Sequence, residues 1–165
     1  MMLKFRSMRV STETQSHENH FARLVQTNAR MTKLDAVGDP RLIPGGRILR
    51  AAGLDELPQL FNVLRGEMSI VGPRPCTPHE LKNYKVSQHE RFDAVPGLTG
   101  HWQVNGKNRT TFTDMIDLDI FYSRNKSLWL DLTIIAKTIP ALVGQLQESR
   151  AFRRTELAHP LLPPV

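Results

Sequence analysis

The segment from Leu54 to Gly66 constrains the fold most strongly, because its apolar residues recur at helical spacing. Those at i, i+3, i+4 and i+7 are Leu57, Leu60, Phe61 and Leu64. This spacing predicts a helix with one apolar stripe, which Gly66 ends. We expect Asp55 to be the N-cap and Pro58 to lie in the first turn, where its missing N–H leaves no intrahelical acceptor unpaired.

The rest of the chain adds further helices and few strands. MSIVGPRP predicts a short strand at 68–71 and then a rigid turn in which Pro73 and Pro75 flank Arg74. The polar stretch at 11–33 reads as peripheral, either a loop or a weak surface helix. Turns are expected at 39–50, a short strand near 101–104, and helices at 79–92, 112–122 and 127–147. This pattern predicts an α+β fold: a helix-dominated single domain over 1–147, with amphipathic interfacial helices, and a Pro-rich, disordered tail at 148–165.

Composition narrows the function classes. The 165 residues suit one domain, and 22 Lys and Arg against 16 Asp and Glu give a net charge of +6, which favours anionic partners. Cys76 is the only cysteine, which excludes an internal disulfide and a thiolate-rich zinc site. The last helix carries a long apolar stripe, from Leu128 to Val143, that either packs on the core or lies in a lipid interface.

Asp55 and Glu56 are the first candidates for chemistry. A carboxylate at a helix start can attack phosphorus if a divalent cation and nearby Arg or Lys screen the repulsion between the anions, and Glu56 is a suitable oxygen ligand for Mg²⁺. The plainer interpretation is that Asp55 only caps the helix and Glu56 only faces the solvent. The segment alone leaves both open.

Arginines in or beside turns are candidates for phosphate binding, because the guanidinium fork suits bidentate contacts with phosphate. For any single arginine, a solvated surface charge is the simpler interpretation. Arg74 stands out, since two flanking prolines restrict its backbone. Trp102, in the glycine-rich PGLTGHWQVNG, is expected to fill the core rather than stack on a base.

Several motifs, taken in order, resemble the bacterial sugar transferase family. They are KFRSM (4–8), DPR (39–41), GRILR (46–50), LDELPQLFNVLRGEMSIVGPRP (54–75), PGLTG (96–100), WQVNGKN (102–108), LDIFY (118–122) and SLWLDL (127–132). The resemblance covers roughly residues 3–145. It implies a magnesium-dependent transfer of sugar-1-phosphate from a UDP-sugar to undecaprenyl phosphate, which starts exopolysaccharide, capsule or O-antigen units at the cytoplasmic face of the inner membrane.

The resemblance also implies roles for individual residues. Asp55 would be the nucleophile that takes up the phosphosugar, and Glu56 would be catalytic and hold the metal. Lys4, Arg50 and Arg74 match family positions for phosphate and nucleotide contacts, and Asp119 matches another functional acidic position. The partners implied are a UDP-sugar, undecaprenyl phosphate and the membrane surface, through peripheral or monotopic attachment.

Departures from the family pattern keep other functions open. Family members carry a hydrophobic re-entrant segment before KFRSM, so we expect this chain to be a truncated form. One alternative is therefore a non-catalytic remnant that binds a nucleotide or a partner protein. A nucleic-acid-binding module is disfavoured, because the aromatic residues do not alternate with a basic run. The oligomeric state and the sugar transferred are not readable from the sequence.

Overall fold

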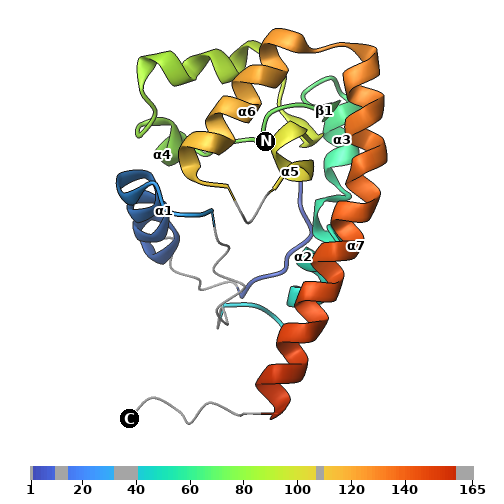
Figure 1. Cartoon of the computed structure of the whole chain (residues 1–165). Helices are drawn as coiled ribbons and strands as arrows, with labels where there is room; N and C mark the ends of the chain where they lie inside the picture. The colour runs from blue at the N-terminus through green and yellow to red at the C-terminus, as the bar shows by residue number, and fades with distance from the viewer. Residues whose placement is uncertain (1, 10–14, 32–40, 107–109, 159–165) are drawn as a thin grey trace.

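The computed structural model describes residues 2–9, 15–31, 41–106 and 110–158. Helices dominate this part of the chain, and two short strands complete it, as the α+β prediction requires (Figure 1). The elements are α1 (Gln15–Thr27), α2 (Gly46–Ala51), η2 (Leu54–Glu56), α3 (Gln59–Leu64), β1 (Ser69–Val71), α4 (Pro78–Leu81), η3 (Val86–Asp93), β2 (Gly97–Thr99), α5 (His101–Val104), α6 (Phe112–Asn125) and α7 (Leu128–Ala158), where η marks a 3₁₀ helix.

The two strands bring distant motifs together. β1 and β2 pair in parallel, with Ser69 opposite Gly97 and Val71 opposite Thr99. Gly72, just after β1, packs backbone to backbone on Gly97, so closely that a Cβ on either would overlap main-chain atoms of the other segment. Glycine is therefore required here for close approach, and the turn after β1 is held against the start of β2.

The main core cluster joins α1, α5 and α6 with Tyr84, which lies between α4 and η3. Phe21 and Leu24 on α1 are buried in it, and the Phe21 ring meets the Phe112 ring edge to face, with 5.6 Å between centroids. The prediction that 11–33 is peripheral was therefore wrong for α1, whose apolar residues are too few for a strong signal but are well placed for burial. Trp102 is buried as expected, and its indole N–H donates to the Thr110 hydroxyl at 2.7 Å.

α7 runs along one side of the domain and is fastened to the small sheet (Figure 1). Ile134 is buried with Val71 and Tyr122, and the Tyr122 hydroxyl lies 3.1 Å from the Val71 carbonyl and 2.7 Å from an Asp131 carboxylate oxygen. α7 continues to Ala158, past the expected helix end near 147. The remaining residues of the predicted tail, 159–165, lie outside the described part of the chain.

Three local predictions were wrong. Residues 46–51 form a helix instead of turns, because Gly45 adopts a left-handed conformation (φ 79°) that starts α2. The expected helix at 79–92 is divided into α4 and η3, and the expected strand at 101–104 is the helix α5, with the strand just before it at 97–99. Residues 39–40 lie outside the described residues.

α3 turns its apolar stripe outward and its polar side inward. The four residues of the predicted stripe, Leu57 just before α3 and Leu60, Phe61 and Leu64 within it, are all exposed, whereas Gln59 and Asn62 are buried. Asn62 is buried because its side chain accepts from the Leu3 backbone N–H at 3.0 Å and its amide donates to the Glu67 carboxylate. The polar side of α3 thus holds the N-terminal segment.

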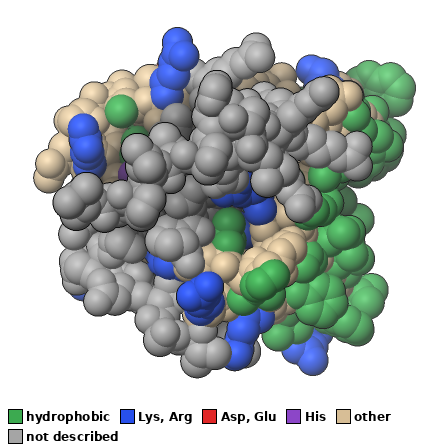
Figure 2. Space-filling model, turned by 90° about the horizontal axis from the view of Figure 1, so that it is seen from below, with side chains coloured by type: hydrophobic (Ala, Val, Ile, Leu, Met, Phe, Trp, Pro, Cys, Tyr) green, Lys and Arg blue, Asp and Glu red, His purple; other side chains and the backbone are tan. Residues whose placement is uncertain are grey.

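α7 adds a second exposed apolar stripe, on the face that does not pack on the domain. Its members are Leu128, Trp129, Leu132, Ile135, Ile139 and Val143. Figure 2 shows hydrophobic side chains gathered along one side of the molecule, with Lys and Arg side chains beside them. The sequence left two interpretations of this stripe, packing on the core or lying in a lipid interface. Because these residues are exposed, they do not pack on the core. Within the described residues, no helix is both long and apolar enough to span a bilayer.

Candidate functional site

Asp55 and Glu56 lie in the 3₁₀ turn η2, between α2 and α3. Gly53 precedes this turn in a left-handed conformation (φ 69°), and Pro58 is the residue that caps α3. The prediction that Asp55 is a helix N-cap was therefore wrong. Pro58, three residues later, caps α3, so Asp55 and Glu56, called the dyad below, lie in a separate 3₁₀ turn. Asp55 is only 4% exposed, whereas the Glu56 side chain is 38% exposed.

The N-terminal segment packs directly against this turn. The Phe5 backbone N–H donates to the Asp55 carbonyl at 2.9 Å, and the Lys4 ammonium lies 2.8 Å from a Glu56 carboxylate oxygen. The same segment is pinned further along, where the Ile43 N–H donates to the Ser7 carbonyl at 3.1 Å. Residues 52 positions apart in the sequence thus form one charged pair. The KFRSM motif therefore contacts both the backbone of Asp55 and the side chain of Glu56.

Arg50, near the end of α2, is connected to neighbouring elements through its backbone carbonyl. Its carbonyl accepts from the Gly53 N–H at 3.2 Å and from the Gln145 side-chain amide at 3.2 Å. These bonds link the end of α2 to the turn that carries the dyad and to α7. The backbone of Arg50 is therefore tied to Gly53, the residue that precedes the turn of Asp55 and Glu56.

Arg74 occupies the rigid turn after β1, as predicted, and its guanidinium is held by Glu80. The two ion-pair contacts are 3.1 and 3.5 Å long, and the Arg74 side chain remains 29% exposed. Glu80 is itself buried, because it closes a capping box with Thr77 at the start of α4. Burial lowers the pKa of Arg74, but the Glu80 carboxylate more than offsets this, so the pKa lies above its ordinary value. Arg74 is thus a fixed cation whose side chain is partly exposed.

Asp119 lies inside the protein rather than on a substrate-facing surface. It is fully buried on α6, and its carboxylate contacts the Arg91 guanidinium at 2.5 Å. Burial raises the pKa of Asp119 to about 6, and the positive charge of Arg91 opposes that rise. Among the predicted ligand-binding residues, Asp119 alone has no exposed surface.

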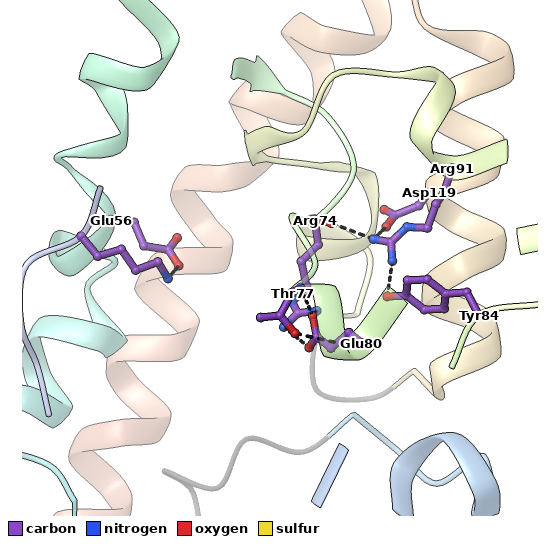
Figure 3. Close-up of polar contacts among 8 residues, drawn as sticks. Glu56, Arg74, Thr77, Glu80, Tyr84, Arg91 and Asp119 are labelled. Atoms are coloured by element: carbon purple, nitrogen blue, oxygen red, sulfur yellow. Dashed lines mark hydrogen bonds and ion pairs between the residues drawn. The ribbon is translucent and has the colours of Figure 1, made fainter. Parts of the chain in front are cut away.

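The structure therefore arranges the predicted site residues in two groups. Figure 3 shows Glu56, which pairs with Lys4, apart from a second cluster of Arg74, Glu80, Arg91 and Asp119. Asp55 belongs with the first group as the neighbour of Glu56 in η2, and Arg50 at the end of α2 is joined to it by the Gly53 N–H bond. Sequence reasoning missed Glu80 and Tyr84, and it did not single out Arg91, which is fully buried. The Thr77–Glu80 spacing of a capping box was the available signal for Glu80.

Glu56 supplies the exposed carboxylate that a magnesium ion would need. Mg²⁺ is commonly bound through one or two carboxylates, with substrate phosphates and water completing its coordination. No cluster of three or more His, Cys, Asp or Glu side chains occurs within the described ranges. The donor set therefore fits a shared metal, held by Glu56 together with a phosphorylated ligand, better than a closed protein cage.

Comparison with known proteins identifies the family to which these motifs belong. The profile of the family described as "Bacterial sugar transferase" matches residues 1–145. The chain is 48% identical over 104 residues to the exopolysaccharide production protein ExoY of Sinorhizobium fredii, covering 63% of this chain and 46% of that protein. It is 48% identical over 114 residues to the UDP-glucose:undecaprenyl-phosphate glucose-1-phosphate transferase of Caulobacter vibrioides, covering 64% and 43%.

A third relative has the same pattern of coverage. The undecaprenyl-phosphate galactose phosphotransferase of Salmonella typhimurium is 47% identical over 100 residues, which are 61% of this chain and 21% of that protein. The chain thus spans less than half the length of each of these three relatives. The family match covers nearly all of the chain and includes both clusters of the site, so the protein belongs to the bacterial sugar transferase family.

Proposed function

We propose that this chain transfers sugar-1-phosphate from a UDP-sugar to undecaprenyl phosphate, as a first membrane step of exopolysaccharide synthesis. The observation that carries the proposal is the Asp55–Glu56 turn, held beside Lys4 in a chain of this family. The names of the Caulobacter and Salmonella relatives describe such a transfer, which supports the same reaction class here.

In the first half-reaction, an Asp55 carboxylate oxygen attacks the phosphorus that bears the sugar. A new oxygen–phosphorus bond forms, the bond from that phosphorus to the bridging oxygen breaks, and UMP leaves with the electron pair. Because attacker and target are both anionic, cations must neutralise the developing charge. Lys4, Arg50 and Arg74 are the side chains proposed for this task.

In the second half-reaction, a phosphate oxygen of undecaprenyl phosphate attacks the same phosphorus. The bond to Asp55 breaks, the carboxylate is regenerated, and a lipid-linked sugar diphosphate is released. One phosphate pocket then serves donor and acceptor in turn, which predicts ping-pong kinetics. The low exposure of Asp55 suits a nucleophile whose acyl phosphate must be shielded from water.

Glu56 is the residue proposed to hold Mg²⁺ together with diphosphate oxygens. When bound, the ion would supply positive charge at the transferring phosphoryl group. In the structure, Lys4 provides the positive charge beside the Glu56 carboxylate.

The exposed apolar stripes of α3 and α7 support attachment to a membrane surface. Leucine, isoleucine and phenylalanine side chains together with Trp129 form the kind of surface that enters a lipid interface, and the net charge of +6 favours anionic headgroups. The lipid acceptor would reach the site from this surface. We propose that the protein acts at the cytoplasmic face of the inner membrane, as a peripheral or monotopic enzyme.

The function is tested by UMP release. The full chain is incubated with Mg²⁺, undecaprenyl phosphate in detergent, and UDP-glucose or UDP-galactose; Asp55→Asn is expected to abolish UMP release, and Asp117→Asn, an exposed carboxylate on α6, to leave it unchanged. UMP release that survives Asp55→Asn would remove the proposed nucleophile. Binding of UDP by a wild-type chain that releases no UMP from any UDP-sugar would instead favour the non-catalytic alternative.

A further inference from the structure

Arg91 is a buried charge at the meeting point of three segments. Its side chain is fully buried on η3, and one terminal nitrogen donates to the Tyr84 hydroxyl at 2.6 Å. The other terminal nitrogen donates to the Asp119 carboxylate at 2.5 Å and to the Arg74 backbone carbonyl at 2.8 Å (Figure 3). One guanidinium thus connects η3, α6 and the turn that carries Arg74.

This cluster is not arranged for stability alone. The Arg91 Nε and one Asp119 carboxylate oxygen are buried without a hydrogen-bond partner in the part of the chain that the structure describes. A buried ion pair with unsatisfied atoms stabilises a fold less than well-packed apolar residues of similar size. The feature that an apolar replacement could not reproduce is the hydrogen bond to the Arg74 carbonyl.

The turn around Arg74 depends on bonds from outside. Pro73 and Pro75 have no backbone N–H, so the turn has few donors of its own. The Gly97 N–H donates to the Pro73 carbonyl at 3.0 Å, and Arg91 donates to the next carbonyl, that of Arg74. Glu80 then holds the Arg74 guanidinium. The backbone and the side chain of Arg74 are therefore held by different residues.

We infer that Arg91 is a positioning residue for Arg74: it holds the Arg74 backbone so that the guanidinium faces the diphosphate of the donor. The inference rests on the proposed function, in which Arg74 contacts that diphosphate. Asp119 balances the charge of Arg91, its carboxylate is also stabilised by the Arg74 backbone, and Tyr84 accepts a further bond from Arg91. The acidic residue of the LDIFY motif therefore acts on the Arg74 turn and not on the substrate. Being fully buried, Arg91 makes no contact with the substrate itself.

Two variants test this role. Arg91→Lys keeps the charge but cannot reach all three partners, and Tyr84→Phe removes one hydroxyl while keeping the ring that stacks on Phe112 at 5.5 Å between centroids. We expect Arg91→Lys to raise the KM for the UDP-sugar, and the Kd for UDP measured by calorimetry, about tenfold, with a smaller effect on kcat. Tyr84→Phe should change the same quantities in the same direction, to a smaller extent.

The matched control is Arg124→Lys. Arg124 pairs with Glu90 and so joins the same two elements, α6 and η3, but at the surface. We expect this variant to leave KM and the Kd for UDP unchanged. If Arg91→Lys and Tyr84→Phe lower the unfolding temperature but leave both constants at wild-type values, Arg91 is only structural and the inference is overturned.

A double-mutant cycle tests whether Arg91 affects UDP binding through Arg74. In an Arg74→Ala background, Arg91→Lys should weaken UDP binding no further, because the group that it positions is gone. Full additivity of the two substitutions would overturn the inference. Because UDP binding needs no turnover, a wild-type chain that binds UDP without releasing UMP would refute the transfer reaction and still allow this cycle to be read. Absence of UDP binding by the wild-type chain would overturn both.

Discussion

The Lys4 ammonium lies 2.8 Å from a carboxylate oxygen of Glu56, with both side chains more than one-third exposed. The adjacent Phe5 N–H donates to the Asp55 carbonyl. One short segment therefore supports the backbone of the proposed nucleophile and sets the charge beside the proposed metal ligand. Its contribution to function should exceed its contribution to stability.

Lys4→Met tests this separation. Exposed ion pairs contribute from nothing to about 1 kcal/mol to stability, so the free energy of unfolding in urea should change by less than that. UMP release should fall by at least about tenfold, because a cation is lost where negative charge develops. Lys126→Met, at the exposed lysine that follows the end of α6, is the control for loss of one positive charge. An equal loss of activity in both variants would refute a local role for Lys4.

The raised pKa of Asp119 predicts a pH dependence of stability. Burial raises this pKa to about 6 in the folded protein, from an ordinary value of 3.8. A group whose pKa rises on folding favours the folded state when it is protonated, so its contribution is full below about pH 4 and is lost as the pH rises through about 6. The free energy of unfolding of the wild type, minus that of Asp119→Asn, should therefore fall between these pH values. A difference that grows with pH would show that folding lowers this pKa.

The close approach of Gly72 and Gly97 predicts a large effect of one methyl group. Gly97→Ala places a Cβ against the Gly72 backbone and should destabilise the protein by about 1–3 kcal/mol. Gly144→Ala is the matched control, since a Cβ there meets no atom within 4 Å and the residue lies within α7; it should stabilise by about 0.5–1 kcal/mol. Equal unfolding midpoints for the two variants in urea would contradict this packing.

Membrane attachment through α7 can be tested on its exposed apolar stripe. Ile139 is 67% exposed, and Ile139→Glu should weaken binding to vesicles that contain anionic phospholipid about tenfold, measured by sedimentation. Thr133→Glu adds the same charge to an exposed position on a different side of α7 and should have a smaller effect. If both substitutions weaken binding equally, charge rather than the apolar stripe determines attachment.

The sequence predicted the helix-dominated class and the local framework of the site, since both follow from short-range signals. The helical spacing after Leu57, the stop at Gly66 and the turn around Arg74 all depend on neighbouring residues. The burial of Arg91 and Asp119 could not be predicted, because their pairing joins residues 28 positions apart. Periodicity identified the apolar stripe of α3 but not its direction: Asn62 and Gln59 are buried by contacts that only the tertiary fold creates.

Formation of a covalent phosphosugar on Asp55 is the central claim, and mass spectrometry of the protein tests it most directly. The chain is incubated with Mg²⁺ and the UDP-sugar that supports turnover, without the lipid acceptor, then digested and analysed. We predict release of up to one UMP per protein, and a hexose phosphate on the peptide containing Asp55 that disappears when undecaprenyl phosphate is added. Normal turnover with the acceptor, but neither adduct nor UMP release without it, would contradict the account.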